Sequence, residues 1–98
     1  MSYRAIYDGR IIAEATDDAV KRIEGNVYFP PDSVRQKYLQ DSNRHSRCYW
    51  KGRASYFHVV GKSGVAPDAA FSYPKPWPLA KNLKDYVAFW RGVRVERR

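Results

Sequence analysis

Cys48 and His45 lie three residues apart, with Arg47 and Lys51 on either side of the cysteine. Nearby positive charge favours the thiolate form of a cysteine, and a histidine can accept the thiol proton, so this group has the residue types of a nucleophilic site. A lone cysteine is also a common small buried residue. The spacing shows no third group that would orient the histidine, which argues against a catalytic triad. Two interpretations stay open: an enzyme that uses Cys48, and a buried, unreactive thiol.

The carboxylates offer a second kind of chemistry. Glu24, Asp32 and Asp68 would serve as general acids or bases if burial changed their affinity for protons. Asp32 also fits the N-cap of a helix, because it stands just before a segment with helical spacing. The sequence therefore leaves a cleft carboxylate open as a catalytic group.

Metal-binding residue types are few and scattered. Cys48 is the single cysteine, and His45 and His58 do not stand at the HxxxH, HExxH or CxxC spacing that gathers ligands on one element. Gly61-Lys62-Ser63 is similar to the end of a phosphate-binding loop, but Tyr56 stands where that motif requires its first glycine. We therefore expect no metal, no cofactor and an ordinary turn at residues 61–64.

Aromatic residues alternate with cationic residues through the middle of the chain. Exposed aromatic rings beside basic side chains stack nucleic-acid bases and hold phosphates. A small β protein also fills its core with aromatic residues, so both interpretations stay open. The aromatic set is Tyr49, Trp50, Tyr56, Phe71, Tyr73 and Trp77, and the cationic set is Arg47, Lys51, Arg53 and Lys75.

The composition limits the kind of protein that carries these residues. Ninety-eight residues suffice for one domain with one core, and we expect a single domain over 1–98 with a basic C-terminal tail at about 94–98. No run of residues is apolar enough to span a membrane, and no apolar leader follows the first residues, so a cytoplasmic location is expected. The formal net charge of +8 favours an anionic partner.

The elements that position the candidate residues are mostly strands. Asp8-Gly9 predicts a tight turn in an opening hairpin. Val34 and Tyr38 stand four residues apart behind a proline and two capping residue types, which predicts a short helix over Val34–Leu39. We expect a polar loop over Gln40–Arg47, a stiff extended segment at 74–78 and a helical turn at Leu79–Lys84. The predicted strands are Ala19–Glu24, Val27–Phe29, Arg53–Val60, Ala69–Tyr73 and Tyr86–Trp90.

Four sequence blocks resemble a bacterial and fungal family known as domain of unknown function 427. The blocks are Gly25–Asp32, Cys48–Tyr56, Asp68–Pro76 and Tyr86–Trp90, in that order. The resemblance runs from Tyr7 to Trp90, and the residues after Val95 lie outside its pattern.

The resemblance implies an all-β, mainly antiparallel fold of the β-tent, Mss4-like class, with one short helix and a cleft between two sheets. Zinc-bearing relatives of that class use cysteine pairs that this chain lacks. The family also carries a nucleotidyltransferase label, but the paired aspartates of that chemistry occur only as Asp17-Asp18, whose side chains would point to opposite faces of a strand.

We expect a binding module for a small anionic or aromatic ligand held between the two sheets. Lys51 would supply charge, Tyr56 and Tyr73 stacking surface, and Ser55 and Asp32 hydrogen bonds. The alternatives are single-stranded nucleic-acid binding through the basic aromatic face and an enzyme that uses Cys48 or a cleft carboxylate. No membrane partner is expected, and the oligomeric state stays open. The expected ligand-binding residues are Asp32, Cys48, Trp50, Lys51, Ser55, Tyr56 and Tyr73.

Overall fold

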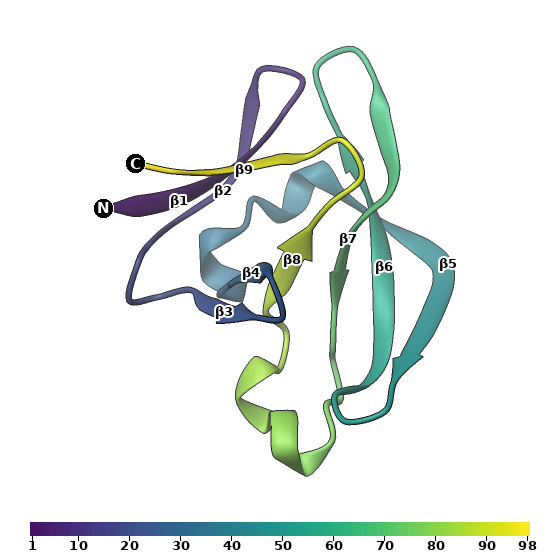
Figure 1. The fold of residues 1–98 in the computed structure, drawn as a ribbon. Helices are drawn as coiled ribbons and strands as arrows, with labels where there is room; N and C mark the ends of the chain where they lie inside the picture. Colours follow the sequence, from purple (N-terminus) through teal and green to yellow (C-terminus); the bar gives the residue numbers. More distant parts are fainter.

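A computed structural model describes residues 1–98, and its chain forms two antiparallel sheets (Figure 1). The smaller sheet has the strand order β2-β1-β9, with β1 at Ser2–Tyr7, β2 at Arg10–Thr16 and β9 at Arg94–Arg97. Asp8 and Gly9 link β1 to β2 with φ values of 54° and 70°, the left-handed backbone that the predicted turn requires. The opening hairpin is therefore confirmed.

The larger sheet has the order β3-β4-β8-β7-β6-β5. Its strands are β3 (Lys21–Ile23), β4 (Asn26–Phe29), β5 (Leu39–Cys48), β6 (Gly52–Val60), β7 (Val65–Ser72) and β8 (Val87–Phe89). Every paired strand in both sheets is antiparallel, so the predicted all-β class is confirmed. The strand predicted at Ala69–Tyr73 begins four residues earlier than expected, at Val65.

The predicted helix over Val34–Leu39 is wrong. Val34 has extended backbone and forms an isolated bridge with Ala13 of β2, and its side chain is buried. Only short 3₁₀ segments flank it, η1 at Pro31–Ser33 and η2 at Gln36–Tyr38. Val34 and Tyr38 both pack against the same core. Their four-residue spacing therefore arises because both side chains are buried, although the segment between them is not an α-helix. The helical turn expected at Leu79–Lys84 is present as a third 3₁₀ segment, η3, at Pro78–Leu83.

The polar loop predicted over Gln40–Arg47 is also wrong, because these residues belong to β5, the outer strand of the larger sheet. An edge strand that buries neither face is held by backbone pairing with β6 and needs no apolar alternation. A register shift between Asp41 and His45 inserts extra residues opposite Tyr56. The Ser42 hydroxyl in this bulge donates to the Asp68 carboxylate at 2.5 Å, which ties β5 to β7.

The basic C-terminal tail predicted at about 94–98 contains a strand, β9. Residues 94–97 pair with β1 in a continuous register, and Val95 packs against the core. The backbones of Ser2 and Arg98 extend this pairing with two hydrogen bonds, at 2.7 and 2.8 Å. Arg94 and Arg97 therefore lie on an ordered strand.

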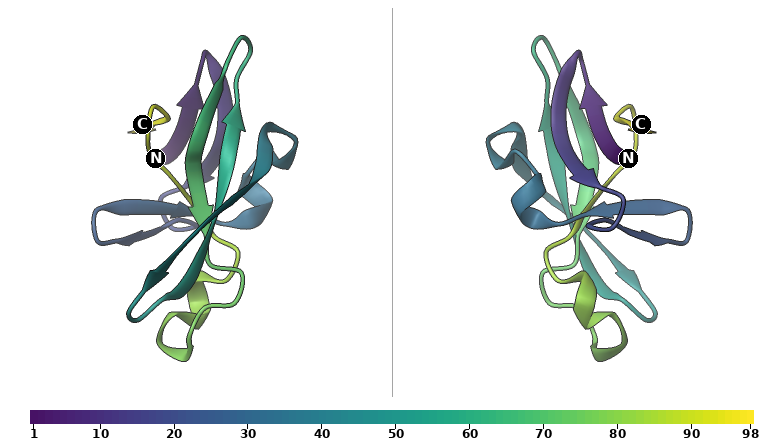
Figure 2. Two further views of the ribbon diagram at one scale, coloured as in Figure 1. Left: turned by 90° about the vertical axis from the view of Figure 1, so that its right-hand side faces the viewer. Right: turned by 90° about the vertical axis from the view of Figure 1, so that its left-hand side faces the viewer.

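Two apolar clusters cover the two faces of the larger sheet. The first joins the sheets, since it combines Ala5 and Ile12 of the smaller sheet with Phe29 and Val59 of the larger. The second lies on the opposite face, under η3, because neighbouring residues of a strand point to opposite sides. Figure 2 shows the sheets edge-on, with the β3–β4 hairpin and the segment at 31–38 extending to different sides. The second cluster is Tyr28, Ala54, Tyr56, Phe71, Tyr73, Ala80, Leu83 and Ala88.

A polar contact holds the tips of two hairpins together. The Asp8 carboxylate accepts a hydrogen bond from the Ser63 backbone N–H at 2.6 Å and one from the Ser63 hydroxyl at 3.1 Å. Gly61 allows this approach, because a Cβ at that position would lie 2.6 Å from the Asp8 carboxylate. Residues 61–64 thus form the ordinary turn that was predicted, and this turn donates hydrogen bonds to the carboxylate of Asp8. No helix has the length and apolar character needed to cross a bilayer.

Candidate functional site

Lys51 lies in the turn between β5 and β6 and is 5% exposed. Its ammonium donates to the Tyr28 hydroxyl at 3.3 Å and forms an ion pair with Glu24. The same nitrogen lies 5.3 Å from the ring centre of Trp50 and 5.7 Å from those of Tyr28 and Tyr73. A cation at these distances from ring faces is attracted by the aromatic quadrupoles. We call this group the Lys51 cage.

The charges within the Lys51 cage stabilise one another. Burial disfavours the charged form of Lys51, but the hydrogen bonds to Glu24 and Tyr28 outweigh it, and the pKa of Lys51 lies above its usual range. The hydrogen bond from Lys51 and its positive charge lower the pKa of Glu24. Lys51 therefore stays protonated, which makes it a poor nucleophile, and its charge already has a carboxylate partner.

The phenols of the cage hold their protons. Burial raises the pKa of Tyr73 to about 12 and also raises the pKa of Tyr28. Cys48 packs against the second apolar cluster beside these rings. His45 is instead held by the Ala54 carbonyl, 3.2 Å from its Nδ1 atom. The structure therefore does not bring Cys48 and His45 together as a nucleophile and base.

The expected site residues fall into separate groups. Cys48, Trp50, Lys51 and Tyr73 gather at the Lys51 cage, with Tyr28 and Glu24 as partners. Tyr56 is 7% exposed, and its hydroxyl lies 2.9 Å from Ser46 Oγ. Tyr56 and Tyr73 are both in the core, so neither offers a free ring face for stacking.

Asp32 and Ser55 lie outside the cage. Asp32 is exposed in η1, which has no side-chain cap, so the predicted capping role is wrong. Ser55 lies on β6 directly opposite His45 of β5. It is the one expected ligand-binding residue that faces an open pocket without belonging to the cage or to the core.

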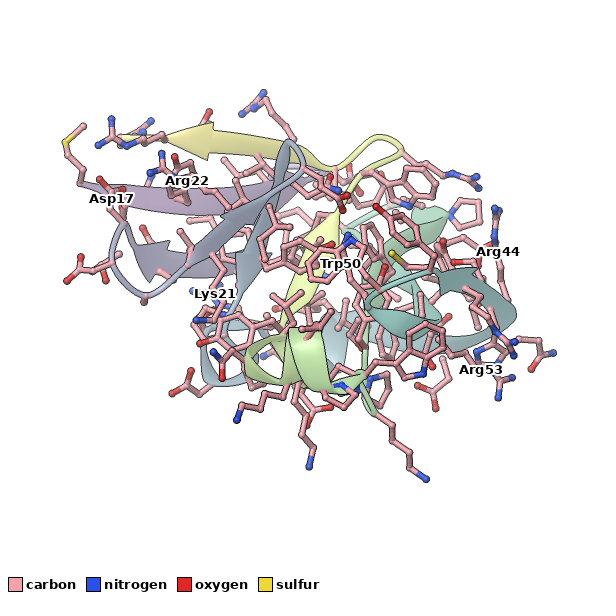
Figure 3. All side chains as sticks on the ribbon, turned by 60° about the horizontal axis from the view of Figure 1, so that its bottom comes forward. Asp17, Lys21, Arg22, Arg44, Trp50 and Arg53 are labelled. Atoms are coloured by element: carbon pink, nitrogen blue, oxygen red, sulfur yellow. The ribbon has the colours of Figure 1, made fainter.

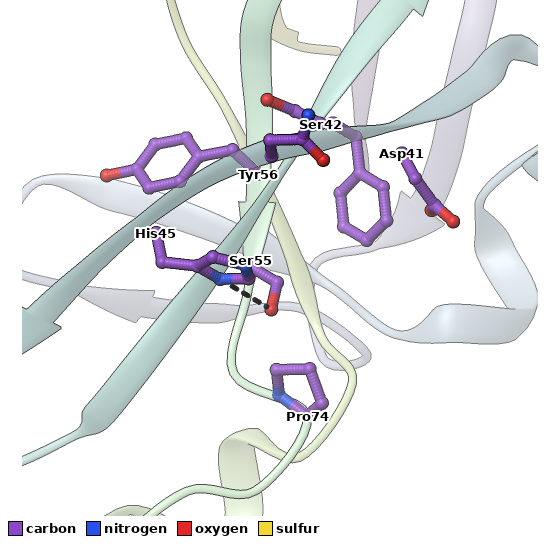
Figure 4. A pocket seen from close by; sticks show the side chains of 8 residues that line it. Asp41, Ser42, His45, Ser55, Tyr56 and Pro74 are labelled. Carbon is purple, nitrogen blue, oxygen red and sulfur yellow. Dashed lines mark hydrogen bonds between the residues drawn. The ribbon is translucent and has the colours of Figure 1, made fainter.

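The β5–β6 hairpin carries two opposed arginines on the face that holds Ser55. The register places His45 opposite Ser55 and Arg47 opposite Arg53, and residues directly opposite in a ladder point to the same face. Figure 4 shows His45 and Ser55 on the two strands beside Pro74. Neither arginine takes part in any of the six ion pairs of the structure. We call His45, Arg47, Arg53, Ser55 and the neighbouring Lys75 the arginine face.

Three adjoining hollows lie over the arginine face. One of about 280 Å³ is lined by His45, Ser46, Arg47 and Arg53, and one of about 230 Å³ by Arg53, Ser55, Pro74 and Lys75. The third, of about 430 Å³, shares His45, Ser55 and Pro74 and includes the only carboxylate of the three, that of Asp41. In Figure 3, Arg44 and Arg53 project from this end of the molecule, while Trp50 lies toward its middle.

The Ser55 hydroxyl does not form a serine–histidine dyad of the hydrolase kind. Its oxygen is 3.5 Å from His45 Nδ1, the limit of a hydrogen bond, and the same nitrogen is 3.2 Å from the Ala54 carbonyl. A nitrogen that donates its proton to a carbonyl cannot also accept one from serine. This geometry leaves the Ser55 hydroxyl free to donate to a ligand and does not make His45 a base that activates it.

Sequence analysis missed the pairing of Arg47 with Arg53. Arg47 was noted beside Cys48, and both arginines among the cations that alternate with aromatic residues, but they were not paired because residues 40–47 were assigned to a loop. A strand ending at Cys48, with a turn at 49–51, places position 47 opposite position 53 by simple counting. The partnership of Lys51 with Glu24 had no signal in the spacing, since the two residues are 27 positions apart.

Comparison with known proteins gives one finding about the family and none about a curated relative. No curated protein matches the chain. The family model described as Domain of unknown function (DUF427) matches residues 2–98. The match continues past Val95, so the residues after Val95, which were expected to lie outside the family pattern, fall within the matched region. Because the match spans almost the whole chain, this protein belongs to the DUF427 family.

Proposed function

We propose that this domain is a binding module for an anionic ligand, and that the ligand binds at the arginine face. One observation carries the proposal. Arg47 and Arg53 stand directly opposite each other on β5 and β6, and neither has a carboxylate partner. Like charges placed opposite each other in a sheet destabilise the fold by about 0.2–1 kcal/mol. An anion between them would turn this repulsion into two attractions.

The chemistry of the arginine face favours a phosphate or a carboxylate. Guanidinium groups present planar pairs of N–H donors that match the oxygens of such anions. Lys75 lines the same hollow as Arg53 and adds a third positive charge, and the Ser55 hydroxyl adds a neutral donor. Asp41 lines only the hollow farther along β5, which favours the arginine end for the anion.

This proposal keeps the expected class of ligand but changes its place. The sequence predicted a small anionic or aromatic ligand in a cleft, with Lys51 as its charge. Lys51 is buried and paired with Glu24, so its charge is not available to a ligand. The positive charge comes instead from Arg47, Arg53 and Lys75. Ser55 keeps its predicted role as a hydrogen-bonding group for the ligand. A cytoplasmic location, where phosphorylated ligands are abundant, remains part of the proposal.

The test is an NMR titration of the ¹⁵N-labelled chain with inorganic phosphate and pyrophosphate at low ionic strength. We expect saturable amide shifts at Arg47, Arg53 and Ser55, with pyrophosphate binding more tightly. Arg53→Thr should weaken pyrophosphate binding about tenfold, in line with loss of one charge-assisted contact of about 1.4 kcal/mol.

Arg94→Thr is the matched control, because Arg94 is an exposed strand arginine of the smaller sheet. It should leave pyrophosphate binding unchanged. Shifts spread evenly over all arginine-bearing strands, or an equal loss in both variants, would contradict a site at the arginine face.

A further inference from the structure

Two aromatic side chains remain outside the core at the same end of the molecule. Tyr49 is 86% exposed, in the turn between β5 and β6, and Trp77 is 42% exposed. Neither belongs to either apolar cluster. Buried aromatic rings contribute to packing, but a large exposed ring gives up that stabilisation. These two rings are therefore candidates for contact with a bound ligand.

The proline segment, residues 74–78, places Lys75 at the arginine face and packs Trp77 against the adjoining turn. The Trp77 backbone N–H donates to the Lys51 carbonyl at 3.0 Å, and its ring packs over Gly52. Gly52 has a φ of 107°, and a Cβ there would lie 3.3 Å from the Trp77 ring and 3.5 Å from the Lys75 carbonyl. A glycine at this position therefore lets the segment lie directly against the turn.

Rings and cations consequently share one short stretch of structure. Tyr49 lies in the turn that joins the strands of Arg47 and Arg53, while Trp77 and Lys75 lie on the segment packed against that turn. Proteins that bind single-stranded nucleic acid combine exposed rings, on which bases stack, with unpaired cations along the phosphate backbone.

We propose that the ligand of the arginine face is single-stranded nucleic acid, with Tyr49 and Trp77 stacking on bases and Arg47, Arg53 and Lys75 contacting phosphates. This inference rests on the proposed function, because it names the class of anion that the face binds. A single strand fits better than a duplex, since ring stacking requires bases that are not already stacked on both faces.

The binding assay uses fluorescence anisotropy of a labelled oligothymidylate of about 10 nucleotides, a length within the range that small single-strand binding folds cover. Three phosphate contacts predict that log K falls with log salt concentration with a slope of about −2, at roughly 0.7 for each contact. A duplex of the same length should bind more weakly than the single strand.

The decisive variant is Tyr49→Ala. Tyr49 is almost fully exposed, so its removal leaves the fold intact, and the affinity for the oligonucleotide should fall about 5- to 150-fold, as for loss of one base–aromatic stack. Tyr49→Phe keeps the ring and should restore binding. Leu79→Ala is the matched control, because Leu79 is equally exposed at 86% on η3 but has no aromatic ring.

The outcomes separate this inference from the proposed function. If pyrophosphate shifts the arginine face but Tyr49→Ala leaves oligonucleotide affinity unchanged, single-strand recognition is overturned and anion binding stands. Tighter binding of the duplex would also overturn it. If neither pyrophosphate nor the oligonucleotide binds, both proposals fail.

Discussion

The Lys51 ammonium and the Tyr28 hydroxyl lie 3.3 Å apart in the interior, and the two residues come from segments 23 positions apart in the chain. The contact joins the β5–β6 turn to β4, and Glu24 at the β3–β4 turn completes it through an ion pair. One lysine thus connects two hairpins of the larger sheet.

Lys51→Met tests this connection, because methionine keeps the apolar stem and removes the ammonium. We expect a loss of about 1–3 kcal/mol in the free energy of unfolding, since the Tyr28 hydroxyl is left buried without its donor. Urea denaturation measures it. Lys62→Met, at an exposed lysine, is the control and should stay within about 0.5 kcal/mol of the wild type. A Lys51→Met protein as stable as the wild type would show that the cage adds no net stability, as happens for some buried ion pairs.

The phenol of Tyr73 should titrate at unusually high pH. Burial raises its pKa to about 12, so the folded state holds the proton more tightly than the unfolded chain, where the value is near 10.0. The stability that this contributes is complete below about pH 10 and is lost as the pH rises toward 12. The pH dependence of phenolate absorbance is measured for the wild type and for Tyr73→Phe, and the difference between the two curves gives the titration of the Tyr73 phenol. A midpoint near 10 for that phenol would refute its burial.

Asp8→Asn should lower stability at neutral pH and make it less sensitive to acid. The hydrogen bonds from the Ser63 backbone and hydroxyl lower the pKa of Asp8 below 3.8. Stability from this carboxylate is therefore present above about pH 4 and lost as the pH falls further. Thermal unfolding between pH 2 and pH 7 shows the effect. Asp32→Asn is the control, because Asp32 is exposed and caps nothing, and an equal change in both variants would refute the role of the hairpin contact.

Arg53→Thr should stabilise the protein while it weakens the proposed binding. It removes the repulsion between Arg47 and Arg53 and places a β-branched residue on the strand, for a gain of about 0.2–1 kcal/mol. The gain should shrink as added salt screens the charges, which urea denaturation at two salt concentrations measures. Arg94 faces Ile6 and forms an ion pair with Glu96, so Arg94→Thr removes an attraction instead of a repulsion and should not stabilise the protein. A destabilised Arg53→Thr would mean that the guanidinium has a partner in the folded chain.

The parts of the fold that sequence could predict are those fixed by neighbouring residues. The opening hairpin follows from Asp8-Gly9, because these residue types tolerate positive φ at low cost. The alternation from Ala54 to Val60 predicted β6, whose two faces are both covered, at least in part. Ser55 was placed correctly on this strand as a polar residue, although the face it shares with Arg53 was not foreseen.

The errors come from residues whose conformation is decided by distant contacts. Val34 is extended because it bridges Ala13, 21 positions earlier, which overrides a helical spacing. The polar strand β5 has no apolar pattern, since backbone pairing and the contact between Ser42 and Asp68 hold it in place. The Lys51 cage forms only when β4 and the β5–β6 turn come together in the fold. The contact between Lys51 and Tyr28 could therefore not be predicted from neighbouring residues in the sequence.

The outer position of β5 also bears on how copies of this protein behave at high concentration. An edge strand presents unpaired backbone groups to which a second sheet could add. Between Gln40 and Arg47 both faces of β5 are polar, and pairing of two such edges would bring the arginines of both copies close together. The repulsion that makes this strand suitable for an anion therefore also opposes edge-to-edge aggregation, and a multivalent anion that neutralised it would remove that protection.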